Sequence, residues 1–179
     1  VLRGRFYATR ISGVEGLARV QSWPARTSLP ALVRVLAEVD RALAAAPTYD
    51  AFLSKHRDDL YVWVRAARAV GQVGDPLGAP VLVHLLRTSL PGPLEVVQEV
   101  AIAPGERRTE RTTVHRDALH ELRLAAIDSL SRLKVPYTVS ALLEALEDPD
   151  LEIRTLAHAA LQRITNQDRG FVPRNDPTS

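Results

Sequence analysis

The sequence predicts an all-α protein, an α-solenoid of about three stacked helical hairpins. Two observations predict the helices: apolar residues recur with helical spacing, and the spacing itself repeats along the chain. Composition is the third, because 46% of the 179 residues are hydrophobic but only 5% are aromatic. That balance favours helices packed on helices over a β-sandwich, in a chain long enough to bury a core.

Two helical patterns alternate. The A pattern has apolar residues at offsets 0, 3, 4 and 7, and the B pattern has them at offsets 0, 4, 8 and 11. Both sets of offsets describe one face of an α-helix. The A pattern starts at Leu29, Ala79 and Val139, and the B pattern starts at Val62, Leu122 and Ile153.

The spacing of these patterns predicts the domain organisation. Each B pattern starts 17 residues before the next A pattern, and in the last unit A precedes B by 14 residues, so the basic unit has 31 residues. We expect repeats at 28–75, 76–135 and 136–168, with insertions at 46–57 and 90–116 inside the turns of the first two hairpins. Residues 1–27 are expected to form an N-terminal cap, with a degenerate helix near 14–21, and 169–179 a polar tail.

Local residues agree with these boundaries. Pro30 and Pro80 lie near the starts of A patterns, where a missing N–H costs little. Acidic residues that we expect to cap the B helices precede each B pattern: Asp58, Asp59, Asp117 and Asp150.

The segment DPDLEIRTLAHAALQRI, residues 148–164, resembles HEAT repeats of the short bacterial kind known from phycobilin (PBS) lyases. The resemblance covers about residues 28–168. It implies a right-handed solenoid with the B helices on the concave side, and a ladder of Asp–Arg pairs between hairpins. Arg123 and Arg154 would take the arginine positions, with Asp148 or Asp150 as partner, whereas Trp63 breaks the ladder in the first unit.

The second insertion has the pattern of a β-hairpin. Two β-branched stretches flank Pro104, Gly105 and Glu106, which predict the turn. We expect opposite charges on the two strands to face each other. Two interpretations stay open: an arm that contacts a partner, or a loop lying on the edge of the solenoid. The candidate contact residues of the arm are Val100, Arg107, Arg108 and Arg111.

The first insertion and the B helix after it gather four of the nine aromatic residues: Tyr49, Phe52, Tyr61 and Trp63. Aromatic side chains are common anchors of protein interfaces, but they also pack a loop onto its own helix. Both interpretations stay open. On the B-helix face we expect Arg65, Arg68 and His158 to join such an interface.

Little in the sequence indicates catalysis. There is no Cys, His120-Glu121 is a single pair where HEAT-type di-iron hydroxylases repeat several, and no phosphate loop or nucleophile elbow occurs. We therefore expect no catalytic residue, no metal and no cofactor. A net charge of +2 without a long basic run disfavours nucleic acid. No apolar stretch approaches the ~20 residues of a membrane span, so we expect a cytoplasmic protein; a removed leader, or a longer chain before Val1, stays open.

The function expected from these features is a non-catalytic module or scaffold that binds a protein or peptide partner across a stacked-repeat surface. Two alternatives stay open. One is a HEAT-type enzyme subunit similar to the phycobilin lyases, and the other is a nucleic-acid-binding solenoid.

Overall fold

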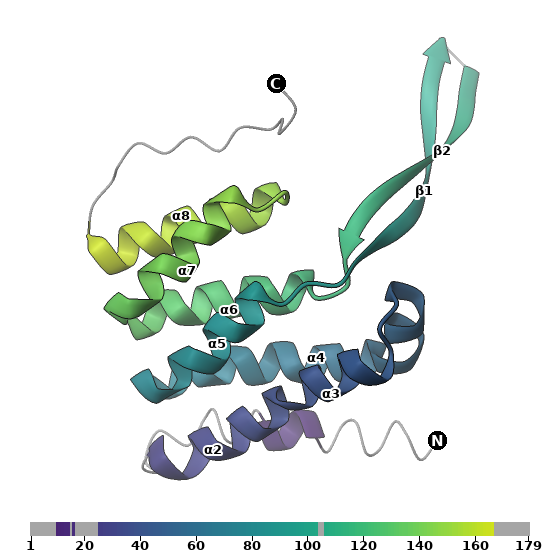
Figure 1. Cartoon of the computed structure of the whole chain (residues 1–179). Coiled ribbons are helices and arrows are strands. Elements are labelled where there is room, and N and C mark those ends of the chain that lie inside the picture. The colour runs from purple at the N-terminus through teal and green to yellow at the C-terminus, as the bar shows by residue number, and fades with distance from the viewer. Residues whose placement is uncertain (1–9, 15, 17–24, 104–105, 167–179) are drawn as a thin grey trace.

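Figure 1 shows a computed structural model of the chain, which describes residues 10–14, 16, 25–103 and 106–166. The described part is mostly helical and has one antiparallel strand pair, as the sequence predicted. Pairs of antiparallel helices stack on one another in chain order, and the strand pair projects from the middle of the stack (Figure 1). We call the three pairs hairpins 1, 2 and 3.

Hairpin 1 is longer than predicted at both helices. Its first side consists of α2 (Ala25–Leu36) and α3 (Glu38–Ala45), and its second side is α4 (Tyr49–Val73). Because α2 begins at Ala25, Pro30 lies inside the helix, and the prediction that it lies near the helix start is wrong. Gly74 ends α4 in the left-handed conformation, with φ of 74°.

The expected insertion at 46–57 is not a separate loop. Residues 49–57 contain no Gly or Pro and form the first turns of the continuous, 25-residue helix α4. The prediction that Asp58 and Asp59 cap a helix is therefore wrong, because both lie in the middle of α4. Asp59 instead accepts a hydrogen bond from Arg10, at 2.7 Å.

Hairpin 2 carries the predicted β-hairpin. After a short 3-10 turn, η1 (Pro76–Gly78), come α5 (Ala79–Arg87), strands β1 (Pro91–Ala103) and β2 (Glu106–Asp117), and α6 (His120–Leu133). Pro80 lies in the first turn of α5, as predicted. The predicted turn falls mainly on residues 104–105, which lie outside the described residues.

Hairpin 3 is the shortest unit. It consists of η2 (Pro136–Thr138), α7 (Val139–Glu144), η3 (Ala145–Glu147) and α8 (Leu151–Thr165). Asp150 caps α8 as predicted, since its carboxylate accepts hydrogen bonds from the backbone N–H groups of Glu152 and Ile153.

The core lies where the helices of successive hairpins meet. α6 packs between α4 and α8. Each of these three helices also packs on an earlier helix of its own hairpin: α4 on α2, α6 on α5 and α8 on α7. Gly71 of α4 lies close to Ser129 of α6, because a Cβ atom at Gly71 would lie 2.8 Å from the Ser129 Cα. The B-pattern residues buried in this core are Val62, Ala66, Val70, Leu122, Ala126, Leu130, Ile153, Ala157 and Leu161.

Part of the predicted N-terminal cap contacts hairpin 1. Residues 10–14 are helical, and Val14 is buried in the core. Arg10 donates hydrogen bonds to Glu38 of α3 and Asp59 of α4. The helix expected near 14–21 lies mostly outside the described residues.

Candidate protein interface

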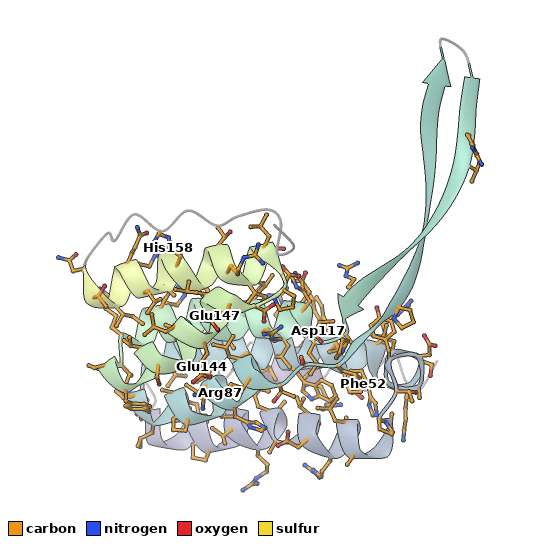
Figure 2. The ribbon with its side chains drawn as sticks, turned by 45° about the horizontal axis from the view of Figure 1, so that its top comes forward. Phe52, Arg87, Asp117, Glu144, Glu147 and His158 are labelled. Atoms are coloured by element: carbon orange, nitrogen blue, oxygen red, sulfur yellow. The ribbon has the colours of Figure 1, made fainter. Side chains whose placement is uncertain are left out.

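The strand pair β1–β2, which we call the arm, extends far from the helical body in both views (Figures 1 and 2). Its strands have 13 and 12 residues and pair antiparallel from Pro91–Asp117 at the root to Ala103–Glu106 near the tip. A two-stranded ribbon leaves the outer backbone groups of both strands unpaired in a sheet. The arm therefore offers two edges to which another strand could bind.

The register corrects the expected charge pairing in the arm. Glu95 is opposite Thr113 and Glu99 is opposite Thr109. The candidate arginines stand opposite small or aliphatic residues, Arg107 opposite Ala101 and Arg111 opposite Val97. Since no Glu stands directly opposite an Arg among the paired residues, the expected face-to-face ion pairs are wrong.

The root of the arm is fixed by one carboxylate. Asp117 Oδ1 accepts hydrogen bonds from the backbone N–H of Leu90, where the chain enters the arm, and from that of Leu119, where it leaves (2.8 and 2.9 Å). The Ala118 N–H donates to the Leu90 carbonyl at 3.0 Å, closing the base of the ribbon. The two ends of the insertion are thereby held side by side (Figure 2).

A glycine seats the arm on hairpin 1. Gly92 is buried, and a Cβ atom there would lie 2.1 Å from Cγ of Tyr49, the first residue of α4. Any side chain at this position would push the root away from α4. Tyr49, which is itself buried, thus packs against the root of the arm.

Arg123 connects the arm root to hairpin 3. Its guanidinium donates to Asp117 Oδ2 at 3.2 Å, to the Leu86 carbonyl at 2.9 Å and to the carboxylate of Asp148. Asp148 lies before α8 as Asp117 lies before α6, and its Oδ1 likewise accepts from the N–H two residues later. The Arg123–Asp148 pair is the contact between hairpins that the family resemblance implied.

The other ladder residues bind differently from the expected Asp–Arg pair. Arg154 donates to the backbone carbonyls of Asp148 and Pro149 at 2.7 and 2.9 Å. Asp150 caps α8 and contacts His120 Nδ1 at 3.1 Å, while His120 Nε2 lies 3.2 Å from Glu152. His120 therefore belongs to the junction between α6 and α8.

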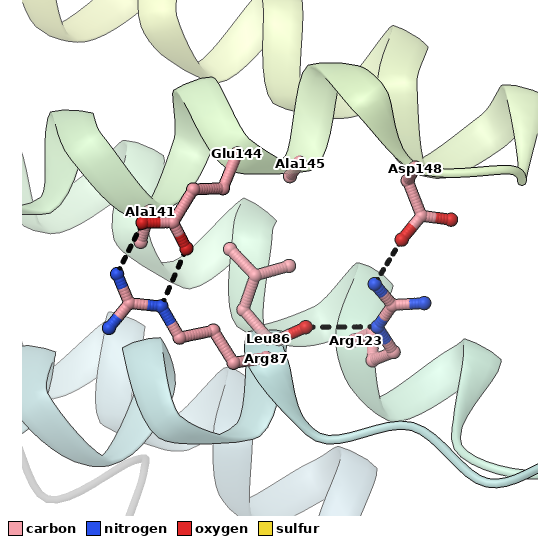
Figure 3. Close-up of a pocket in the computed structure, with 7 residues that line it drawn as sticks. All are labelled: Leu86, Arg87, Arg123, Ala141, Glu144, Ala145 and Asp148. Atoms are coloured by element: carbon pink, nitrogen blue, oxygen red, sulfur yellow. Dashed lines mark hydrogen bonds and ion pairs between the residues drawn. The ribbon is translucent and has the colours of Figure 1, made fainter.

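A pocket of about 190 Å³ lies between α5 and α7 (Figure 3). Arg87 binds Glu144 at its mouth through two hydrogen bonds, of 2.8 and 2.7 Å. The hydrogen bond raises the pKa of Arg87 and lowers the pKa of Glu144. The polar side chains of this pocket are already paired, Arg87 with Glu144 and Arg123 with Asp148. Both pairs connect hairpin 2 to hairpin 3. The lining residues are Leu86, Arg87, Arg123, Ala141, Glu144, Ala145 and Asp148.

Three of the four candidate aromatic anchors are core residues. Phe52 and Trp63 are 0% and 1% exposed, and their ring centroids lie 6.2 Å apart. The His56 ring lies 5.9 Å from Trp63 and 5.4 Å from Phe52. Together with the burial of Tyr49, this corrects their assignment to a surface and favours the interpretation that they pack onto their own helix.

The fourth aromatic candidate is a surface residue. Tyr61 is 45% exposed, and Arg65 Nη2 donates to its hydroxyl at 2.6 Å, with the guanidinium carbon 5.1 Å from the ring centroid. Arg68 is exposed one turn further along α4, whereas Arg65 is half-buried. These three residues form what we call the α4 patch.

The remaining candidates lie elsewhere. His158 is half-buried on α8 (Figure 2), at the repeat position of Ala67 and Ile127, so it does not adjoin the α4 patch. Arg108 is exposed on the arm. The side chains of Val100, Arg107 and Arg111 lie outside the described part of the structure.

Sequence reasoning missed the roles of two residues at the arm root and of one at the pocket. Asp117 was expected to cap α6, but no side chain caps the start of that helix, and Gly92 and the pocket residue Arg87 were not singled out. One signal was available: Asp117 and Asp148 both precede their B patterns by five residues. That equivalence could have identified both as partners of Arg123.

The described residues offer little to other kinds of site. They contain no group of three or more His, Asp or Glu side chains that could hold a metal ion. Among the helices described, none is long and apolar enough to cross a membrane.

Comparison with known proteins identifies one segment. No curated protein and no solved structure gave a significant match to the chain. Residues 122–148, which run from α6 to the turn before α8, match the PBS lyase HEAT-like repeat family. This match supports the HEAT-repeat resemblance indicated by the sequence, over residues 122–148.

Proposed function

We propose that this protein is a non-catalytic protein-interaction module: a short α-solenoid of three HEAT-like hairpins that presents the arm to a partner protein. The observation that carries the proposal is the fixed root of a long, projecting arm. Gly92 seats it on α4, and Asp117 ties its two ends together and to Arg123.

A fixed root favours binding. A flexible arm would lose conformational entropy when a partner ordered it, whereas an arm held in one direction has lost part of that entropy already. A partner strand that adds to either edge would gain a ladder of backbone hydrogen bonds. This mode needs no catalytic residue.

The α4 patch is the second contact that we propose. It lies on the helix whose first residue supports the arm root, and Tyr61 follows Tyr49 by 12 residues, about 18 Å along the helix. Exposed tyrosine and arginine side chains are enriched where interfaces gain most of their free energy. A partner that spans the root would reach both surfaces.

Site-specific photo-crosslinking tests this proposal. A photoreactive residue at Gln98, in the arm, should give covalent adducts with another protein in the source cells. The same residue at Gln72, exposed near the end of α4, is the matched control and should not. Replacing both Tyr61 and Arg68 by Ala should reduce the Gln98 adducts. If Gln98 gives no adduct with any other protein, the proposal is wrong.

The two alternatives have tests of their own. A phycobilin-lyase-like subunit should shift the absorption spectrum of an added bilin. A nucleic-acid-binding solenoid should bind heparin or duplex DNA with affinity that falls steeply as salt rises. Either result would replace the interaction module as the proposed function.

A further inference from the structure

The backbone of the arm determines which of its polar groups face away from the ribbon. The Ala118 N–H donates to the Leu90 carbonyl at 3.0 Å, and these two residues stand one step beyond the opposed pair Pro91–Asp117. Opposed residues of an antiparallel pair alternate between pairs that bond each other and pairs whose N–H and C=O groups point away from the partner strand. The odd-numbered residues of β1 from 91 to 101, and of β2 from 107 to 117, therefore direct these groups outward.

The outer edge of β1 is interrupted at both ends. Pro91 and Pro93 occupy outward positions at the root, and proline has no N–H to donate. Near the tip the register skips Ile102, which makes this residue a β-bulge in β1. Prolines and bulges are the means by which natural sheets protect an edge from further pairing.

The outer edge of β2 has neither interruption. This strand contains no Pro and no Gly, and five outward residues follow one another at alternate positions from 107 to 115. Each of them offers one N–H donor and one C=O acceptor to a further strand. Among the described strands no third one pairs with this edge. β2 is therefore the edge that is open to a partner strand.

The two strands also differ in charge. From 107 to 116, β2 has four arginines and one glutamate, whereas β1 has two glutamates and neither Lys nor Arg. Arg108 and Arg116 are exposed. Arg107 and Arg111 occupy outward positions of the backbone, four residues apart and hence on one face of the strand. Opposite charges on neighbouring strands stabilise their pairing and like charges oppose it, so a strand beside β2 should be acidic.

A second copy of the chain fits this edge poorly. Two β2 strands related by a two-fold axis would bring the arginines of one copy beside those of the other. The acidic strand β1 of another copy would have to pair through its own interrupted edge. Such a head-to-tail contact would also not close into a dimer.

A nucleic acid fits poorly for a different reason. Glu110 lies among the arginines of β2, and Glu95 and Glu99 are on the adjacent strand. These carboxylates repel a phosphate backbone. A peptide strand gains backbone hydrogen bonds as well as the attraction of the arginines.

We propose that the β2 edge of the arm binds an extended acidic segment of another protein as a third strand. The backbone of the partner pairs with the outward residues from Arg107 to His115. Two acidic residues of the partner, four positions apart, stand beside Arg107 and Arg111. The inference rests on the proposed function of the arm as a contact element, and it adds the edge, the conformation and the charge of what the arm binds.

Two synthetic peptides test the charge of the partner on the full chain. Both have about nine residues, the length of 107–115, and consist of Thr and Val except at two positions four apart, which are Glu in one peptide and Lys in the other. We expect the Kd of the Glu peptide to be at least about tenfold lower, with a difference that shrinks as salt is added.

Arginine variants connect that difference to β2. The double variant Arg107→Ala, Arg111→Ala should raise the Kd of the Glu peptide about tenfold. The matched control is Arg34→Ala, Arg132→Ala, which removes two exposed arginines outside the arm and should leave the Kd unchanged.

Proline variants test the edge without changing any charge. Thr113→Pro removes one outward N–H of β2, and the matched control Val97→Pro removes one outward N–H of β1. Neither variant removes a hydrogen bond between the two strands. We expect Thr113→Pro to raise the Kd of the Glu peptide about tenfold and Val97→Pro to leave it unchanged.

Hydrogen exchange of the unaltered chain gives a measurement that needs no variant. With the Glu peptide bound, the outward amides of Thr109 and Thr113 should exchange more slowly. The outward amides of Val97 and Glu99, on the other edge, should exchange as they do without peptide.

Several results would overturn the proposal: no binding of the Glu peptide, equal affinity for both peptides, or protection of the β1 amides in place of those of β2. Tighter binding of duplex DNA that is lost in the Arg107→Ala, Arg111→Ala variant would make a nucleic acid the occupant. A dimer that the Glu peptide dissociates would make it a second copy. A Gln98 adduct with another protein, together with no peptide binding, would keep the proposed function and reject this edge.

Discussion

The two junctions between hairpins differ at one repeat position. In hairpin 1 this position holds Trp63, which is buried, and nearby Gly71 lets Ser129 of α6 approach α4 and donate a hydrogen bond to the Ala67 carbonyl at 2.9 Å. The junction between hairpins 2 and 3 is polar, with Arg123 bound to Asp148 and His120 to Asp150. One repeat position therefore accepts either a large aromatic ring or a guanidinium.

The insertions explain which residue each junction uses. Five residues before each B pattern stands Asp117 or Asp148 in hairpins 2 and 3, but Arg57 in hairpin 1. Position 57 therefore carries no carboxylate of the kind that Arg123 binds at Asp117. The extra turns of α4 instead bring Phe52 and His56 against Trp63. Hairpin 1, with its extended helix α4, thus has an aromatic cluster in place of the ion pair.

The largest effect should come from removing the aromatic cluster of α4. Trp63→Ala deletes the largest fully buried side chain among the described residues and should lower the free energy of unfolding by about 3–5 kcal/mol, measured by urea denaturation. Tyr61→Ala, two residues earlier and exposed, should change it by no more than about 0.5 kcal/mol. Equal effects of the two variants would show that the Trp63 cluster is not part of the core.

Breaking the polar junction at Arg123 should lower the free energy of unfolding somewhat less. Arg123→Ala leaves Asp117 and Asp148 without their cation, and we expect a loss of about 3 kcal/mol. The loss is at the lower end for a broken buried pair, because both carboxylates keep backbone N–H donors. Arg132→Ala, which breaks an exposed pair with Asp128, should cost under about 0.5 kcal/mol.

Arg123→Ala should also loosen the arm, and hydrogen exchange can measure this. The amide of Leu90 donates to Asp117, which Arg123 holds. Leu90 should exchange faster in the variant, relative to amides in the middle of α4. If the Leu90 amide is equally protected from exchange in both proteins, Arg123 does not help to hold the arm root.

The periodic part of this architecture could be predicted from the sequence. The B-pattern residues are core residues in all three hairpins, and the β-branched stretches of hairpin 2 pair as strands. Both follow from local patterns of apolar residues, which repeat because each unit buries the same side of its helices. The N-cap at Asp150 was predictable for the same reason.

What could not be predicted depends on contacts between distant segments. Trp63 and Tyr61 are both aromatic residues of one helix, and only the position of α6 and of the first turns of α4 decides which is buried. The strand register likewise depends on where the root is closed by Asp117, 27 residues after Leu90. The charges of the arm alone suggested a pairing that this closure does not produce.

The close approach of α4 and α6 should be moderately sensitive to one added methyl group. Gly71→Ala places a Cβ atom 2.8 Å from the Ser129 Cα, so the helices must move apart, and we expect a loss of about 1–2 kcal/mol after the gain in helix propensity. Gln72→Ala, at the exposed neighbouring position, has no such clash and should be neutral or slightly stabilising. A Gly71→Ala variant as stable as the wild type would show that α4 and α6 can separate without cost.

The smallest effect should come from the exposed pair at the mouth of the α5–α7 pocket, and it should depend on pH. Arg87 lowers the pKa of Glu144 in the folded state, so the folded chain holds this carboxylate ionised more readily than the unfolded chain does. The pair therefore stabilises the fold above the unfolded pKa of Glu144, and that contribution is lost as pH falls through the lower, folded pKa. The raised pKa of Arg87 adds no pH dependence here, because arginine stays protonated throughout this range. Glu144→Gln should thus lower the Tm slightly at neutral pH and not at all in strong acid, with the neutral-pH difference shrinking as salt is added. A difference that is independent of pH would show that Glu144 acts through packing and not through its charge.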